Sequence, residues 1–301
     1  MSFRTLIPGE LKTQDVHKMM LGAIAPRPIA FVSTTDKSGQ VNLSPYSFFN
    51  AFGANPPLLV FSPALRGRDG ATKHTLENVQ EVDEAVINIV SYTMVQQMSL
   101  ASSEYPKGVN EFVKAGFTML ESSLVRPPRV LESPAQIECK VKDIIRTGER
   151  GGAGNLVVCE ILAMHINEDV LDQHGQIDPY KIDQVARLGG DWYTRASKGL
   201  FTVPKPLNTL GIGVDSLPDS IRLSHVLTGN DLGLLGNTEN LPSAEEIQVY
   251  SEREEVKSLL DAIRGDVENS TTALHLAARE LLQKGLVSEA WLLLLCSVDQ
   301  G

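Results

Sequence analysis

Residues 25–63 read APRPIAFVSTTDKSGQVNLSPYSFFNAFGANPPLLVFSP and contain three apolar runs, separated by turns rich in hydroxyl and amide side chains. The first run, residues 29–33, alternates in the pattern of a strand that is buried on at least one face. Residues 36–39, Asp-Lys-Ser-Gly, are typical of a tight turn, so we expect the chain from Val41 onward to return antiparallel to the first strand. This stretch therefore predicts a β unit with an apolar core.

The rim of this predicted β unit is unusually polar. Hydroxyl groups beside backbone that Pro45 holds open can receive a polar, planar, phosphorylated ligand. The alternative is a β-sheet whose edges are merely rich in Ser and Thr, and the pattern by itself favours this alternative. The hydroxyl and amide side chains of the rim are Ser33, Thr34, Thr35, Ser44, Tyr46, Ser47 and Asn50.

The whole chain has the composition of an ordinary globular protein, with 42% hydrophobic and 21% charged residues among 301. Its net charge of -10 and its lack of a basic run argue against a nucleic-acid-binding surface, because phosphate binding needs clustered Lys and Arg. We find neither a secretory signal nor an apolar run of the roughly 18 residues that a membrane span requires. Cys139, Cys159 and Cys296 have no CxxC or metal-ligand spacing, so we expect reduced thiols, no metal site and a cytoplasmic protein.

Short strands joined by turns with Gly or Pro dominate the first two-thirds of the chain. Residues 85–91 alternate as a strand, and residues 135–145 and 156–166 are expected to form a hairpin. A short helix over Asp15–Leu21 is expected, capped by Asp15 and stopped at Gly22. Strict β-α-β alternation is missing, so we predict a mainly β barrel or sandwich with added helices rather than a doubly wound sheet.

The pattern changes near Pro204, where Pro and Gly residues mark an irregular linker. Further on, residues 243–246, Ser-Ala-Glu-Glu, form a capping box. Apolar residues at helical spacing follow, with Gly265 and Gly285 as stops and a third helix over Glu289–Cys296. Residues 241–301 carry 11 acidic and 5 basic side chains, which is a net charge of -6. We therefore divide the chain into a first domain, residues 1–204, and a linker with an acidic α-helical extension, residues 205–301.

The clearest candidate for an anion site is the segment Thr72-Lys73-His74-Thr75. A terminal phosphate needs positive charge and several hydrogen-bond donors, ideally at a helix N-terminus. Lys73 supplies charge here, Thr72 and Thr75 supply hydroxyls, and Arg66 and Arg68 can add charge-assisted bonds. By itself the segment is more often explained as a helix capped by Thr.

Several segments resemble the flavin reductase-like family of FMN-binding split β-barrels, which includes the flavoredoxins. They are PRPIAFVST, NLSPYSFFNAFGANPPLL, FSP, TKHTLEN, LASSEYPKGVNEF, ESPAQIECKV and RLGGDWY, in collinear order. The resemblance implies a Greek-key split barrel over the first domain, FMN as the cofactor, and a homodimer with the flavin at its interface.

The resemblance also implies where the flavin binds. The family's phosphate segment matches Thr72, Lys73 and Thr75, and its C-terminal flavin loop matches Gly189 and Gly190. The segments that hold the flavin ring match Ser44, Pro45, Tyr46, Ser47, Phe49, Asn50 and Ala51, flanked by Ser33 and Ser62, with Ala101 and Ser102 on the other side of the ring.

For function, the resemblance implies an oxidoreductase in which hydride or electrons pass from NAD(P)H through FMN to a flavin or another acceptor. Related flavin reductases often carry a Gly-Asp-His segment, but here Gly154-Asn155-Leu156 stands in its place, so that His is absent. His165 is the nearest candidate for a catalytic substitute, although an inward-facing His on a strand is more often a core residue. The alternative is a flavoredoxin-type electron-transfer module, or a partner subunit of an oxygenase system, without its own NAD(P)H site.

Overall fold

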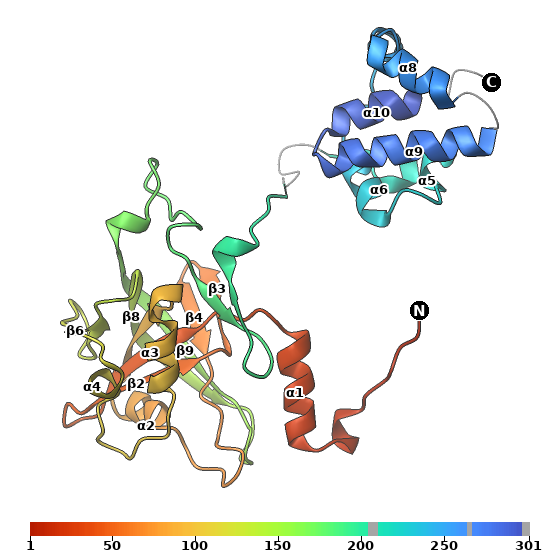
Figure 1. Ribbon diagram of the computed structural model, residues 1–301. Coiled ribbons are helices and arrows are strands. Elements are labelled where there is room, and N and C mark those ends of the chain that lie inside the picture. Colours follow the sequence, from red (N-terminus) through yellow and green to blue (C-terminus); the bar gives the residue numbers. More distant parts are fainter. Residues whose placement is uncertain (204–209, 264–266, 297–301) are drawn as a thin grey trace. The chain divides into compact units, whose positions relative to one another are not determined.

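The computed structural model describes residues 1–203, 210–263 and 267–296, and the chain divides into two compact units, residues 1–201 and 202–301 (Figure 1). Each unit is described by itself. Pro204 and Pro206 of the predicted linker and Gly265, the predicted helix stop, lie outside the described residues.

The first unit is built on a seven-stranded antiparallel sheet with the order β2-β1-β5-β8-β9-β4-β3 (Figure 1). The edge strands β2 and β3 follow one another in the chain and are joined only by Ser47 and Phe48. The sheet therefore has to curl until its two edges meet, which produces a barrel. The strands are β1 Ala30–Thr35, β2 Val41–Tyr46, β3 Phe49–Ala54, β4 Pro57–Phe61, β5 Glu84–Ile89, β8 Ala135–Arg146 and β9 Asn155–Ile166.

The predicted hairpins are confirmed. Val41 pairs with Thr35 across the turn at Asp36–Gly39, where Gly39 has a φ of 85° and the Asp36 carboxylate accepts the Gln40 amide at 2.9 Å. Hydrogen bonds from Ser38 and Gln40 lower the pKa of Asp36, as expected for a carboxylate that the turn stabilises. Strands β8 and β9 form the second predicted hairpin, with Ala135 opposite Ile166.

Strand β1 lies at the centre of the packing because both of its faces are buried. Ala30 and Val32 belong to the core that fills the barrel, whereas Phe31 belongs to a second core outside it. Helix α2, His74–Glu81, adds Leu76 to the barrel core, and the outer core is covered by helices α3 and α4. Side chains alternate between the faces of a strand, so this single strand joins both cores.

Short elements complete the first unit. The predicted N-terminal helix differs in its bounds: it begins at Thr13, follows Lys12 instead of an Asp15 cap, and includes Gly22. A glycine within a helix costs only about 1 kcal/mol relative to alanine, so Gly22 does not by itself end the helix at the expected stop. The remaining elements are α1 Thr13–Ala23, α3 Val95–Ala101, α4 Glu111–Ala115, the strand pairs β6 Met119–Leu120 with β7 Arg129–Val130 and β10 Val185–Arg187 with β11 Tyr193–Arg195, and 3-10 turns at Pro8–Glu10, Tyr92–Met94, Glu168–Val170 and Ala196–Lys198.

The second unit is helical, and its core surrounds Trp291, which is fully buried. The indole Nε1 of Trp291 donates to the carbonyl of Leu235 and to Oγ1 of Thr238, both at 3.1 Å. The capping box predicted at Ser243 and Glu246 is present in both directions. The helices are α5 Asp219–Arg222, α6 Gly229–Gly236, α7 Ala244–Ser251, α8 Glu254–Ile263, α9 Val267–Gln283 and α10 Val287–Leu295, preceded by a 3-10 turn at Val214–Ser216. Among the described residues, no helix is long and apolar enough to cross a membrane.

Candidate functional site

A polar pocket of about 270 Å³ opens in the first unit between strand β2, the start of helix α2 and the loop after helix α3. Strand β2 contributes alternate residues to it, namely Asn42, Ser44 and Tyr46. This follows from the pleat, because residues two apart on a strand point to the same side. The other lining residues are Arg66, Arg68, Thr72, Lys73, His74, Thr75, Ala101, Ser102, Ser103, Glu104, Tyr105, Pro106 and Glu111.

One end of the pocket is cationic, and two carboxylates lie among its cations. Asp69, which does not line the pocket, is 3.4 Å from Arg66 Nε and 3.6 Å from Arg68 Nε, and Glu104, which does line it, contacts all three cations. Glu104 Oε2 is 2.6 Å from Arg68 Nη2 and 3.9 Å from Arg66 Nη1. Glu104 Oε1 is 3.8 Å from Lys73 Nζ. All three cationic side chains come from the loop between β4 and α2, and Lys73 is the last residue of that loop. Such a group of donors suits an anion with several oxygens.

Helix α2 starts at the same end of the pocket. Lys73 is its N-cap residue and makes no side-chain capping bond among the described residues. The Thr75 hydroxyl accepts a hydrogen bond from Asn42 Nδ2 at 2.8 Å, whereas the Thr72 hydroxyl donates to Glu77 Oε1 at 2.6 Å. An uncapped helix N-terminus directs backbone N–H groups and a partial positive charge toward the pocket, which adds to the charge of the three cationic side chains.

The pocket also contains two buried titratable groups. The hydroxyl of Tyr46 is buried and forms no hydrogen bond with any residue that the structure describes. Burial raises the pKa of Tyr46, and the polar groups of Thr75 and Ser44 offset part of this effect. Burial also raises the pKa of Glu111, whose Oε2 accepts the Leu43 amide at 2.9 Å. Since an unpaired buried hydroxyl costs stability, Tyr46 is suited to bonding a ligand group in the pocket.

The structure brings together seven of the residues expected at the flavin site. They come from three separate segments, yet all of them line this one pocket. They are Ser44, Tyr46, Thr72, Lys73, Thr75, Ala101 and Ser102.

The remaining expected residues do not line this pocket. Ser33 is buried and donates its hydroxyl to the carbonyl of Pro128, and the Ser62 hydroxyl accepts the Asn155 amide at 3.1 Å. Both hydroxyls are therefore already used in hydrogen bonds to the protein backbone. The others are Pro45, Ser47, Phe49, Asn50, Ala51, Gly189 and Gly190, of which Ser47 accepts from Arg27 Nε at 3.4 Å and Gly189 lies against Gly22.

Several lining residues are absent from the sequence-based expectation. Asn42 could have been found, because it lies two residues before Ser44 on the same predicted strand. Glu104 and Glu111 lie within the quoted segment LASSEYPKGVNEF, but an acidic side chain is not an obvious choice for a phosphate pocket. Their positions depend on long-range packing between the α3–α4 region and β2.

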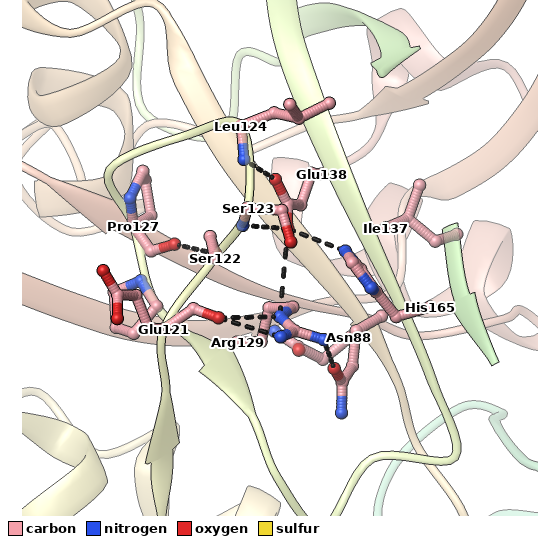
Figure 2. A network of polar contacts seen from close by, with 12 residues as sticks. Asn88, Glu121, Ser122, Ser123, Leu124, Pro127, Arg129, Ile137, Glu138 and His165 are labelled. Carbon is pink, nitrogen blue, oxygen red and sulfur yellow. Dashed lines mark hydrogen bonds and ion pairs between the residues drawn. The ribbon is translucent and has the colours of Figure 1, made fainter. Parts of the chain in front are cut away.

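His165, the sequence-based candidate for catalysis, lies outside this pocket in a second polar network (Figure 2). Its Nε2 is 2.7 Å from Oε1 of Glu138, a carboxylate that is fully buried on β8. Glu138 also accepts the amides of Ser123 and Leu124 at 2.7 and 2.6 Å, and Arg129 Nε lies 3.8 Å away. The network thereby fastens the segment around Ser123 to the barrel.

The electrostatics of Glu138 fit a structural role. Burial by itself raises the pKa of Glu138, but the hydrogen bonds from Ser123, Leu124 and His165 outweigh burial and hold that pKa below its ordinary value. A carboxylate with several such donors stays ionised and satisfied in a buried position. His165 therefore has a partner that explains its presence without catalysis.

Comparison with known proteins agrees with this architecture. Residues 21–181 match the family model described as flavin reductase like domain. A protein of Halalkalibacterium halodurans is 34% identical over 203 residues, which cover 67% of this chain and 96% of that protein.

Two solved structures share the fold. Nitrilotriacetate monooxygenase component B from Bacillus cereus superposes with a TM-score of 0.63 at 30% identity, and the match covers 67% of this chain and 100% of that one. A protein with a split barrel domain from Shewanella frigidimarina NCIMB 400 superposes with a TM-score of 0.58 at 27% identity, covering 68% of this chain and 99% of that one. With the family model matching more than half of its length, this chain belongs to the flavin reductase-like family of split-barrel proteins.

Proposed function

We propose that this protein binds FMN in the pocket between β2, α2 and the loop after α3, and that it passes hydride or electrons from NAD(P)H to a flavin or another acceptor. Its family supports the coarser statement, a flavin-related oxidoreductase role. The observation that carries the finer proposal is the cationic end of the pocket, where Arg66, Arg68 and Lys73 converge beside the start of α2.

The residues of the pocket fit a flavin nucleotide in kind. Cationic side chains and the N-terminal amides of α2 suit its phosphate. Ser44, Ser102 and the hydroxyl of Tyr46, which has no hydrogen-bond partner among the described residues, suit the polar groups of the rest of the molecule. A volume of about 270 Å³ is near the lower end for pockets that hold drug-sized ligands, so part of a flavin would extend beyond it.

The protein's own contribution is binding and orientation. Lys73 and the two arginines would hold the phosphate, and Tyr46 would donate its hydroxyl, whose pKa burial raises above the ordinary value of 10. Bound FMN would supply the capacity to accept a hydride or electrons and to pass them on. The network around Glu138 would act indirectly, because it supports the barrel wall rather than the pocket.

A homodimer with the flavin at its interface is part of the proposal, as the family resemblance implies. Helix α1 supports it. Every one of its residues is at least partly exposed within the described part of the chain, and the apolar side chains of Met19 and Met20 are 54% and 43% exposed. The Arg27 guanidinium bonds the carbonyls of Leu21 and Leu188 and thus holds α1 beside the loop that carries Trp192, which is 76% exposed. Exposed apolar side chains of this kind are typical of a surface that a partner covers.

The first experiment is an absorption spectrum of the purified protein, followed by titration with FMN. We expect a flavin spectrum, or quenching of FMN fluorescence with saturation at one FMN per chain. A colourless protein that takes up no FMN would overturn the proposal. Steady oxidation of NADH or NADPH by the FMN-loaded protein would then identify the donor.

A second candidate function has its own support. The structural match to a monooxygenase component B covers all of that protein, and the Gly-Asp-His segment is replaced here by Gly154-Asn155-Leu156. These observations favour a flavoredoxin-type module or a partner subunit of an oxygenase system that takes its electrons from another protein. Absence of turnover with both nucleotides, in a protein that binds FMN, would select this candidate.

A further inference from the structure

Glu104 occupies a position that the proposed function leaves unexplained. Its carboxylate lies at the cationic end of the pocket, within 2.6 to 3.9 Å of side-chain nitrogens from Arg66, Arg68 and Lys73. An acidic side chain there repels any other anion that approaches the same cations. Asp69 also pairs with Arg66 and Arg68, at 3.4 and 3.6 Å, but of these two carboxylates only Glu104 lines the pocket and meets a ligand there.

Glu104 reaches these cations from the other wall of the pocket. It belongs to the loop after α3, in which the Tyr105 amide bonds the carbonyl of Ser103 at 2.9 Å, whereas its cationic partners precede α2. The same loop has a second attachment to α2, because Lys107 Nζ lies 2.8 Å from Glu77 Oε2. The loop therefore stays anchored through Lys107 if the Glu104 carboxylate moves away.

We propose that Glu104 is an internal counter-ion that a phosphate-bearing ligand has to displace, and that this makes it a selectivity residue of the pocket. The inference rests on the proposed function, since FMN is the phosphate-bearing ligand. A ligand with the same ring but no phosphate leaves Glu104 on its cations and gains nothing from them.

The charges favour this exchange. A phosphate monoester carries up to two negative charges and three terminal oxygens, and so it pairs with three cationic groups better than one carboxylate does. The Glu104 side chain is 47% exposed, so it can turn into water at small cost once its cations are taken. Phosphate binding is then less favourable by the free energy of the ion pairs that Glu104 loses.

The test compares wild type with Glu104→Gln, using FMN and riboflavin as the two ligands. Removing the competing charge is expected to lower the Kd for FMN by about five- to tenfold, the size that a few partly exposed ion pairs support. The Kd for riboflavin is expected to stay unchanged. Inorganic phosphate is expected to compete with FMN more strongly in the variant. All binding is read from flavin fluorescence, without any turnover.

Glu81→Gln is the matched control. It makes the same change in net charge on helix α2, but Glu81 does not line the pocket. Circular dichroism and thermal unfolding establish that both variants are folded. We expect the control to bind FMN as wild type does at about 0.1 M salt, where charges beyond about 10 Å are screened.

The outcomes separate the inference from the function on which it rests. Weaker FMN binding by Glu104→Gln would mean that Glu104 arranges the cations, and unchanged binding would mean that it does not compete; either result overturns the inference while FMN binding stands. An equal change for FMN and riboflavin would overturn the selectivity. If neither protein binds FMN, the proposed function fails together with the inference.

Discussion

Nε2 of His165 lies 2.7 Å from Oε1 of Glu138, and this carboxylate is fully buried within the barrel wall. The pair joins strands β8 and β9 within the network shown in Figure 2, and neither residue lines the cationic pocket. His165 was the catalytic candidate of the sequence. In the structure it is one of the groups that satisfy a buried charge, so its loss should affect stability before chemistry.

His165→Ala should therefore lower the free energy of unfolding by about 1–3 kcal/mol, the range for losing a partner of a buried polar group. FMN affinity should remain that of wild type. Urea unfolding and FMN titration measure the two effects separately. His174→Ala, in an exposed turn, is the control and should be neutral for both. If a His165 variant had normal stability but impaired flavin reduction, this result would contradict the structural role and support a role for His165 in catalysis.

Lys73→Ala should weaken FMN binding, because it removes one of the three cations beside the start of α2. A charge-assisted contact of this kind is worth on the order of 1–3 kcal/mol, or roughly a fivefold to hundredfold rise in Kd. Lys142→Ala removes a lysine that also pairs with one carboxylate, Glu160 at 3.0 Å, but does not line the pocket. The control should bind FMN normally. Equal affinity of the Lys73 variant and wild type would locate the phosphate elsewhere.

Glu111→Gln should change how stability depends on pH. Burial raises the pKa of Glu111 above its ordinary value of 4.5, so folding favours the protonated form. This contribution is complete below about pH 4.5 and is lost as pH rises through the higher pKa of the folded state. The glutamine stays neutral and can still accept the Leu43 amide, so the variant should lack this decline.

Urea unfolding from about pH 4 to about pH 8 checks this prediction. The matched control is Glu132→Gln, which alters an exposed carboxylate that also accepts a backbone amide, from Thr118 at 2.9 Å. It retains Glu111 and should keep the wild-type profile. Parallel profiles for wild type and the Glu111 variant would contradict the burial argument.

Trp291→Ala should destabilise the second unit by about 3–5 kcal/mol, because it leaves a cavity and removes the indole hydrogen bonds to Leu235 and Thr238. Its indole is fully buried and donates two hydrogen bonds. If the two units are separate domains, as we propose, FMN binding by the first should be unaffected. Hydrogen exchange of the 210–296 region and FMN titration give the two measurements. Loss of FMN binding in this variant would show that the units depend on one another.

Residues near one another in the chain determine many of this protein's turns, hairpins and helix caps. The turn at Asp36–Gly39, the β8–β9 hairpin and the capping box at Ser243 depend on local periodicity and side-chain chemistry, and they were predicted correctly. Helix bounds were less certain, as α1 demonstrates, because neighbouring residues with similar propensity extend a helix past its expected cap. The family also followed from the sequence, since its motifs occur in collinear order.

Only the tertiary structure decided which of the expected polar residues share a pocket. Ser33 and Ser44 lie on adjacent strands, yet Ser33 bonds Pro128 while Ser44 faces the pocket, because the barrel packs a different segment against each. Glu104 meets Arg68 across 36 residues, and no local pattern predicts that contact. Side-chain partners depend on how distant segments pack, whereas strands and turns depend on a few adjacent residues.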